Sequence, residues 1–252
     1  MNEELINRVP IIIFSYWIIK IAATRLGETG ADVLSKTMQL GYMTASLIFL
    51  GIFLILLIKK LRSKTYSPIL YWLTFTATSL AGTAICDFMD RTLGLGYALG
   101  SSILLVLLLT LIVWYLSERS LSVKKIYTDK TEIFYWTAFL VSNTLGTAIG
   151  DYLADSIGLG FLGGALLIGG VLIVIVLLHF YTRVSTILLF WVAFILTRPF
   201  GANFGDFLTK PLQDGGANLG TIGSSLFFIF ILIALLYREH KIYHKKKLFH
   251  EK

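Results

Sequence analysis

Long apolar runs separated by short polar segments dominate the pattern of this chain. Each run has about 18–22 residues, enough to cross a hydrocarbon core of about 30 Å at the rise of an α-helix. The pattern therefore predicts an all-α membrane protein with eight transmembrane helices. The odd-numbered spans are expected at 9–30, 68–87, 132–151 and 186–206, and the even-numbered spans at 40–58, 95–115, 158–180 and 219–237.

The odd-numbered spans are copies of one template. Each has an aromatic residue followed by tryptophan, then a glycine ten residues after the tryptophan and an aspartate fifteen residues after it, without insertion or deletion. These residues are Trp17, Trp72, Trp136 and Trp191; Gly27, Gly82, Gly146 and Gly201; and Asp32, Asp87, Asp151 and Asp206. Four tandem units follow, at about 8–60, 66–117, 130–181 and 185–237. Two spans per unit preserve orientation, so the repeats are predicted to be parallel in a pseudo-symmetric bundle.

This template resembles a family of bacterial inner-membrane proteins made of four tandem two-span repeats of unknown function, each with its own tryptophan. The likeness rests on the Trp, Gly and Asp positions and covers about residues 10–237. It implies a multi-pass protein of the bacterial inner (plasma) membrane. It implies no activity, because the repeat has no assigned function.

Composition and charge agree with a membrane location. The chain is 56% hydrophobic and only 15% charged, whereas a soluble domain carries about a quarter charged residues. Sixteen of the 22 Lys and Arg residues precede the first span, lie in three connectors or follow residue 237. Such enrichment marks the cytoplasmic side, so both termini are predicted to be cytoplasmic. Residues 1–237 then form one membrane domain and 238–252 a basic cytoplasmic tail, which we expect to contact lipid headgroups rather than nucleic acid.

A polar stripe is predicted on each odd-numbered span. Positions 7, 11 and 15 after the tryptophan are neighbours on one helix face, and nearly all of them are polar or charged. They are Thr24, Glu28 and Asp32; Ser79, Thr83 and Asp87; Asn143, Thr147 and Asp151; and Arg198, Ala202 and Asp206. In lipid such a stripe must face protein or a water-filled path. The tryptophan, near the start of the span, is expected at the cytoplasmic interface.

Small residues form a second stripe. The glycine at position 10 is followed four residues later by Ala31, Cys86, Gly150 or Gly205. This spacing lets helix backbones approach closely, so we expect tight packing with the odd-numbered spans innermost. The single cysteine, Cys86, excludes an internal disulfide.

The four aspartates allow two interpretations. They could cap the polar segments after each span or bond a neighbouring repeat. Alternatively, they could converge with the Thr, Ser and Asn oxygens on a path for a hard cation such as Mn²⁺ or Mg²⁺, or for protons. Asp87 and Asp151 are the first candidates for metal ligands or proton carriers, because no basic residue lies between Trp and Asp in their units.

Three basic residues within the odd-numbered spans are predicted to pair with carboxylates across the bundle and to act in gating: Lys20, Arg25 and Arg198. Asp32 is expected to be tied to Arg25, and Asp206 to Arg198. Unpaired charges at this depth are costly.

These features favour an integral membrane transporter of a cation, with the ion as substrate and no resident cofactor. The expected partners are the lipid bilayer and a small cation or small molecule. Recognised hydrolase, zinc-protease and nucleotide-binding motifs are missing from the sequence, so no enzymatic activity is predicted. A proton-coupled exporter of a small organic solute and a non-transporting scaffold or regulator stay open, as does the oligomeric state.

Overall fold

The computed structural model describes residues 7–117, 126, 128–153 and 158–250, and all regular elements within them are helices. The long helices are α2 (Phe14–Asp32), α3 (Tyr42–Ser63), α4 (Pro68–Asp87), α5 (Gly96–Ser117), α6 (Asp129–Asp151), α7 (Gly160–Tyr181), α8 (Thr186–Thr209) and α9 (Gly220–His250). Short helical turns follow at η1 (Val33–Thr37), η2 (Phe88–Thr92) and η4 (Leu212–Asp214). The all-α prediction is confirmed.

Five described helical segments are long and apolar enough to cross a membrane: 42–63, 68–92, 160–181, 186–209 and 222–243. The chain is therefore a helical protein of membrane type. Three long helices are not among the five: the apolar segment described for α5 is the shorter 96–110, and α2 and α6 each carry four charged residues. In α2 these are Lys20, Arg25 and the stripe residues Glu28 and Asp32, and in α6 three of the four lie in the first turn of the helix. Length and composition alone therefore do not identify α2 and α6 as spans.

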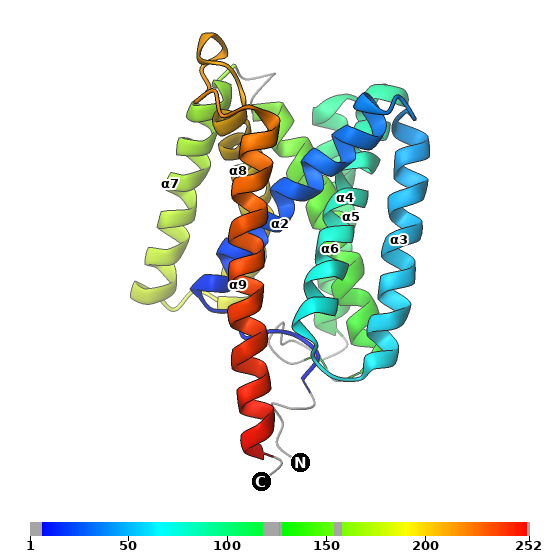
Figure 1. Ribbon diagram of the computed structural model, residues 1–252, viewed down its shortest axis with the longest axis vertical. Coiled ribbons are helices and arrows are strands. Elements are labelled where there is room, and N and C mark those ends of the chain that lie inside the picture. Colours follow the sequence, from blue (N-terminus) through cyan, green and yellow to red (C-terminus); the bar gives the residue numbers. More distant parts are fainter. Residues whose placement is uncertain (1–6, 118–125, 127, 154–157, 251–252) are drawn as a thin grey trace.

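The helices of the odd-numbered spans, α2, α4, α6 and α8, form an inner ring (Figure 1). All four run in the same direction (Figure 1). In the most apolar stretch of each helix, 67% of the residues of α4 and 61% of those of α8 are buried. The corresponding share is 28% for α3, 22% for α7 and 11% for α9. The predicted order, with the odd-numbered spans innermost, is confirmed. We call the end where these helices carry tryptophan the Trp end and the opposite end, with the four aspartates, the Asp end.

Each outer helix packs on the inner helix of the next repeat. α3 lies against α4, α5 against α6, and α7 against α8. α9, from the last repeat, lies along α2 of the first (Figure 1). The ring is thereby closed within one chain, and no repeat is complete without its neighbour.

The glycines at position 10 permit the close approach of inner helices. A methyl group built on Gly146 would lie 2.5 Å from Cβ of Arg198, and one on Gly82 would lie 3.0 Å from the backbone nitrogen of Thr144. Gly27 and Gly201 contact the neighbouring inner helix in the same way, at Ser79 and Thr24. The predicted role of these glycines in packing is confirmed.

A turn at the Asp end joins each inner helix to its outer helix. After Asp32 and Asp87 the chain makes one π-helical turn, with hydrogen bonds from Met38 N to Val33 O (2.8 Å) and from Leu93 N to Phe88 O (3.0 Å). Every outer helix then starts beside a glycine with positive φ, namely Gly41, Gly96, Gly160 and Gly220. Because such a backbone conformation strains other residues, this turn accounts for the Leu-Gly pair that opens every even-numbered span.

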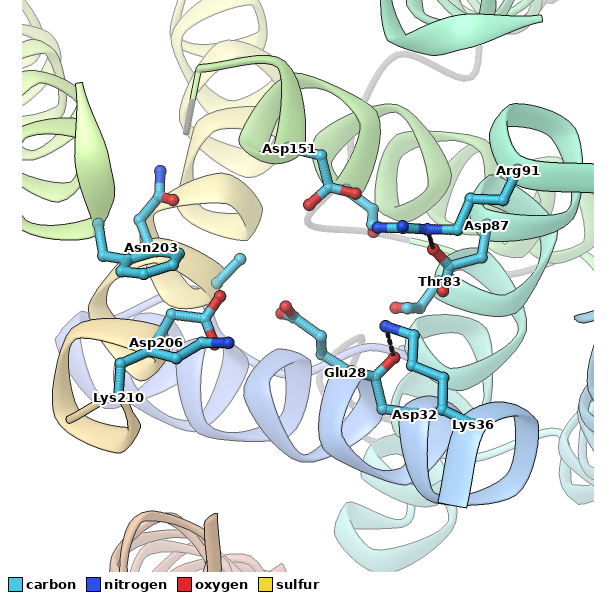
Figure 2. A pocket seen from close by; sticks show the side chains of 13 residues that line it. Glu28, Asp32, Lys36, Thr83, Asp87, Arg91, Asp151, Asn203, Asp206 and Lys210 are labelled. Carbon is cyan, nitrogen blue, oxygen red and sulfur yellow. Dashed lines mark hydrogen bonds and ion pairs between the residues drawn. The ribbon is translucent and has the colours of Figure 1, made fainter. Parts of the chain in front are cut away.

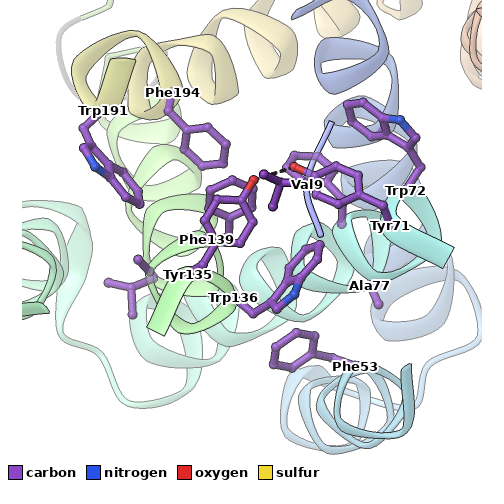
Figure 3. Packing of buried hydrophobic residues seen from close by; sticks show 14 of the residues in the cluster. Val9, Phe53, Tyr71, Trp72, Ala77, Tyr135, Trp136, Phe139, Trp191 and Phe194 are labelled. Carbon is purple, nitrogen blue, oxygen red and sulfur yellow. Dashed lines mark hydrogen bonds between the residues drawn. The ribbon is translucent and has the colours of Figure 1, made fainter. Parts of the chain in front are cut away.

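The core lies at the Trp end and is aromatic (Figure 3). Trp72, Trp136 and Trp191 are 1%, 0% and 5% exposed and pack with Phe139 and Phe194. These three indoles therefore face the interior of the bundle, and their predicted depth at the cytoplasmic interface stays a prediction. They are on the inner ring, where the outer helices cover them, and burial of such large rings stabilises the helix contacts.

Candidate functional site

All four repeat aspartates line one pocket at the Asp end (Figure 2). Its volume is about 180 Å³. The lining side chains come from α2, α4, α6, α7 and α8 and from the turns that follow: Glu28, Asp32, Lys36, Thr83, Asp87, Arg91, Thr147, Asp151, Phe161, Ala202, Asn203, Asp206 and Lys210. The polar stripes therefore face the centre of the ring rather than lipid.

The pocket is the top of a stack of side-chain layers. Each layer takes one residue from every repeat, and successive layers are four residues apart. From the Asp end downward they are Asp32, Asp87, Asp151 and Asp206; Glu28, Thr83, Thr147 and Ala202; Thr24, Ser79, Asn143 and Arg198; Lys20, Phe75, Phe139 and Phe194; and Tyr16, Tyr71, Tyr135 and Phe190. The polar stripe predicted from three positions thus continues for two more turns, where it becomes aromatic.

Two aspartates pair with a basic residue one turn further along the chain. Asp32 Oδ1 lies 2.7 Å from Lys36 Nζ, and Asp87 Oδ1 lies 2.8 Å from Arg91 Nε (Figure 2). Asp87 therefore has a basic partner, although none lies between Trp72 and Asp87. Neither Asp32 nor Asp87 caps the turn that follows it, so the capping interpretation does not hold for these two.

Arg25 joins the first repeat to the fourth. Its guanidinium lies 3.0 Å from Asp206 Oδ1 and 3.4 Å from Glu28 Oε1. Asp32, predicted to bind Arg25, instead binds Lys36. The reason is position on the helix: Arg25 is one residue past the layer that faces the axis, so its side chain reaches the adjacent α8.

Arg198 lies just beneath the pocket, where it contacts the lining residues Thr83 and Thr147, and it is fully buried. Its guanidinium donates to Thr147 Oγ1 (3.1 Å), to Thr83 Oγ1 and to the backbone oxygen of Thr24. Among the described ion pairs its carboxylate partner is Glu28, at 3.7 Å, and not Asp206 as predicted. Residues of three inner helices, α2, α4 and α6, thus bind the one guanidinium. Gly146 leaves room for the Cβ and Cγ atoms of Arg198, which lie against it.

Lys20 lies deeper still and pairs with no described carboxylate. Its Nζ donates to Phe194 O (2.8 Å) and to Thr197 Oγ1 (2.6 Å), and it lies 4.1 Å from the centroid of the Phe194 ring. The prediction that Lys20 pairs with a carboxylate across the bundle is wrong for the described residues. A carbonyl, a hydroxyl and an aromatic face take the place of the anion.

Three other predicted site residues serve the packing of the ring. Ser79 Oγ donates to Thr24 O (3.2 Å), and Asn143 Nδ2 donates to Thr78 Oγ1 (2.9 Å). Thr24 Oγ1 donates to Ile21 O within α2. None of the three lines the pocket.

The basic lining of the pocket went unpredicted. Lys36, Arg91 and Lys210 all stand nineteen residues after the repeat tryptophan, four after the aspartate. The i, i+4 spacing of Asp and Lys or Arg could have revealed them. The six basic residues outside the connectors, the N-terminal segment and the tail all lie at or beneath this pocket: Lys20, Arg25, Lys36, Arg91, Arg198 and Lys210.

The carboxylates surround the pocket instead of meeting at a point. Among the described residues no three His, Cys, Asp or Glu side chains are close enough to hold a metal ion. Asp87 and Asp151, the predicted ligands, border the same space from neighbouring helices α4 and α6. The carboxylates thus border an open space of about 180 Å³ without forming a shared ligand cluster among the described residues.

Comparison with protein families gives four successive matches to the Repeat of Unknown Function (DUF347), at residues 15–66, 70–120, 134–185 and 189–241. The chain belongs to this repeat family. The match confirms the resemblance and the four tandem units. Each matched unit contains the template from Trp to Asp and the outer helix that follows. Neither the curated proteins nor the solved structures provide a match.

Proposed function

We propose that this protein is a membrane transporter of a small cation, which binds in the pocket at the Asp end. The observation that carries the proposal is that four parallel repeats bring their aspartates, together with Glu28, to one space of about 180 Å³. If the polar side chains served only helix packing, we would expect them to contact one another without a cavity between them. Carboxylates in membrane proteins commonly mark ion pathways.

A hard divalent cation with part of its hydration shell fits this lining best. Five carboxylates and three basic groups line the pocket itself, and two further cations just outside the lining, Arg25 and Arg198, pair with Asp206 and Glu28. Mg²⁺ dehydrates reluctantly and commonly binds through one or two carboxylates while keeping several waters. Mn²⁺ prefers the same oxygen ligands. The spacing of the carboxylates around an open volume supports such a hydrated ion.

The proposed topology has eight spans, with the Trp end at the cytoplasm of a bacterial inner membrane. Lys and Arg concentrate in the segments that join repeats at that end, as the positive-inside rule requires. The pocket then opens toward the outside, while Arg198, Lys20 and the aromatic core close the ring below it. A carrier must open these layers to release its cargo on the other side.

Reconstituted full-length protein tests the proposal. Liposomes containing a trapped Mn²⁺-sensitive dye should show Mn²⁺ flux, and Asp87→Asn or Asp151→Asn should reduce it at least tenfold with unchanged folding. Asp129→Asn is the matched control, because this aspartate lies at the Trp end and pairs with Lys64 and Arg8. It should leave flux unchanged.

Two results would contradict the cation assignment. Flux of a small organic amine without flux of Mn²⁺ or Mg²⁺ would assign the pocket to an organic solute. Absence of flux for all these probes, with normal growth of cells carrying Asp→Asn variants, would favour a scaffold.

A further inference from the structure

Lys20 occupies a position where the fold does not require a lysine. In the layer three residues after the tryptophan, the other repeats have Phe75, Phe139 and Phe194, all fully buried. Their rings pack on one another, with centroids 4.0 Å apart for Phe139 and Phe194 and 5.8 Å for Phe75 and Phe139. Three copies thus complete this layer with an apolar side chain, and only the first carries an amine.

The amine is held in an environment that allows it to lose its proton. Lys20 is 0% exposed, and no described carboxylate is within ion-pair distance of its Nζ. Both bonded partners, Phe194 O and Thr197 Oγ1, accept from an N–H of either the ammonium or the neutral amine. Burial without an anion disfavours the charged form.

Its place on the axis connects the pocket with the Trp end. Thr197, which Lys20 contacts, is followed directly in the chain by Arg198, whose guanidinium bonds the pocket residue Thr147. Tyr16 lies one turn toward the Trp end on the same helix and starts a chain of hydroxyls, 3.4 Å to Tyr71 and then 2.6 Å to Tyr135. Charged or titratable groups that face this stretch of α2 are Arg198 on α8, Tyr71 on α4 and Glu239 on α9.

We propose that Lys20 is the proton-coupling residue of this transporter, exchanging one proton for each cation that binds in the pocket. The inference rests on the proposed function. When a cation binds from one side of the membrane, the Lys20 ammonium releases a proton to that side and becomes a neutral amine. When the cation is released on the opposite side, the amine takes up a proton from that opposite side. A protonated Lys20 adds a positive charge beside Arg198, which weakens cation binding, and linkage makes the bound cation favour the neutral amine equally.

The test uses full-length protein in liposomes, with Mn²⁺ alone as the probe and the membrane potential clamped at zero. A pH difference across the membrane should drive wild-type protein to accumulate Mn²⁺ on the acidic side, by about tenfold per pH unit for one proton per ion. Lys20→Phe, which installs the residue of the other three copies, should carry Mn²⁺ only until the two concentrations are equal. Lys20→Met provides a second neutral side chain in case the ring does not fit.

Lys60→Met is the matched control. Lys60 is equally buried but pairs with Glu132 at the Trp end, 3.1 Å away, and its loss should leave the response to the pH difference unchanged. Accumulation by Lys20→Phe and Lys20→Met at the wild-type level would overturn the inference. So would wild-type Mn²⁺ flux that ignores the pH difference, in which case the proposed function stands. Absence of any wild-type flux would overturn both.

Discussion

Ion pairs hold both ends of the inner ring, but in opposite surroundings. At the Trp end, Glu132 and Lys60 are both 0% exposed, and Arg8 lies 2.8 Å from the same carboxylate. At the Asp end, Lys36 and Arg91 side chains are each 41% exposed and border an open pocket. A residue in a buried ion pair cannot change its partner without leaving an unpaired charge in the core. A basic side chain that is exposed to solvent can leave its carboxylate at a smaller cost. The comparison separates a structural cluster from an exchangeable one.

The largest expected effect is at the buried cluster. Glu132→Leu leaves Lys60 without its carboxylate and removes one of the two partners of Arg8, which should lower the free energy of unfolding by about 3–5 kcal/mol. Thermal or denaturant unfolding in detergent measures it. Asp32→Asn is the comparison at the Asp end, and its effect should be much smaller. An equal loss in both variants would remove the distinction between the two ends.

An intermediate effect is expected from the two pocket pairs whose basic side chain is partly exposed. Lys36→Gln and Arg91→Gln remove cations that compete with cargo for Asp32 and Asp87, so Mn²⁺ should bind about three- to tenfold more tightly. Calorimetry on the solubilised protein gives the dissociation constants.

Two further variants distinguish competition between a basic side chain and Mn²⁺ for a carboxylate from a general effect of net charge on Mn²⁺ binding. Lys210→Gln removes the same charge from the lining, but the ammonium of Lys210 lies over the Phe161 ring, 5.5 Å from its centroid. Lys64→Gln breaks a half-exposed pair with Asp129 at the other end. If Lys210→Gln tightened binding as much as Lys36→Gln, the competing-cation explanation would be wrong.

The smallest effect is expected for an exposed ion pair at the Trp end. It tests whether the contribution of an ion pair to stability depends on its burial or on the end of the bundle where it lies. Asp129 is half-exposed at the Trp end, and its hydrogen bonds to Lys64 and Arg8 lower the pKa of its carboxyl. A lowered pKa contributes stability at neutral pH that is lost as the pH falls through the folded-state value. The Tm difference between wild type and Asp129→Asn should therefore be small at neutral pH and shrink toward about pH 3. A difference that grows on acidification would contradict this.

Much of the fold could be predicted because the chain repeats itself. The exact register of Trp, Gly and Asp fixed four parallel units, and the small residues indicated where helices touch. The helical period placed Asp151 on the same face as Thr147, and both line the pocket. These properties depend on spacing along one helix.

The partners of charged residues could not be predicted in the same way. Arg25 was assigned to the aspartate of its own repeat, and it binds Asp206 of the last one. Such a choice depends on which helix lies beside α2 and at what rotation. The burial of the tryptophans could not be predicted for a related reason, since an indole near a span end suits both the membrane interface and a covered core.

Spacing along the chain was enough to predict a helical membrane protein of four like units, the polar face of each inner helix and the small-residue contacts. The packing of each outer helix on the next repeat, the closure of the ring by α9 on α2 and the pocket shared by four aspartates emerged from the three-dimensional arrangement. The physical reason is that the 3.6-residue period fixes directions within a helix, while the meeting of different helices depends on packing of the whole chain.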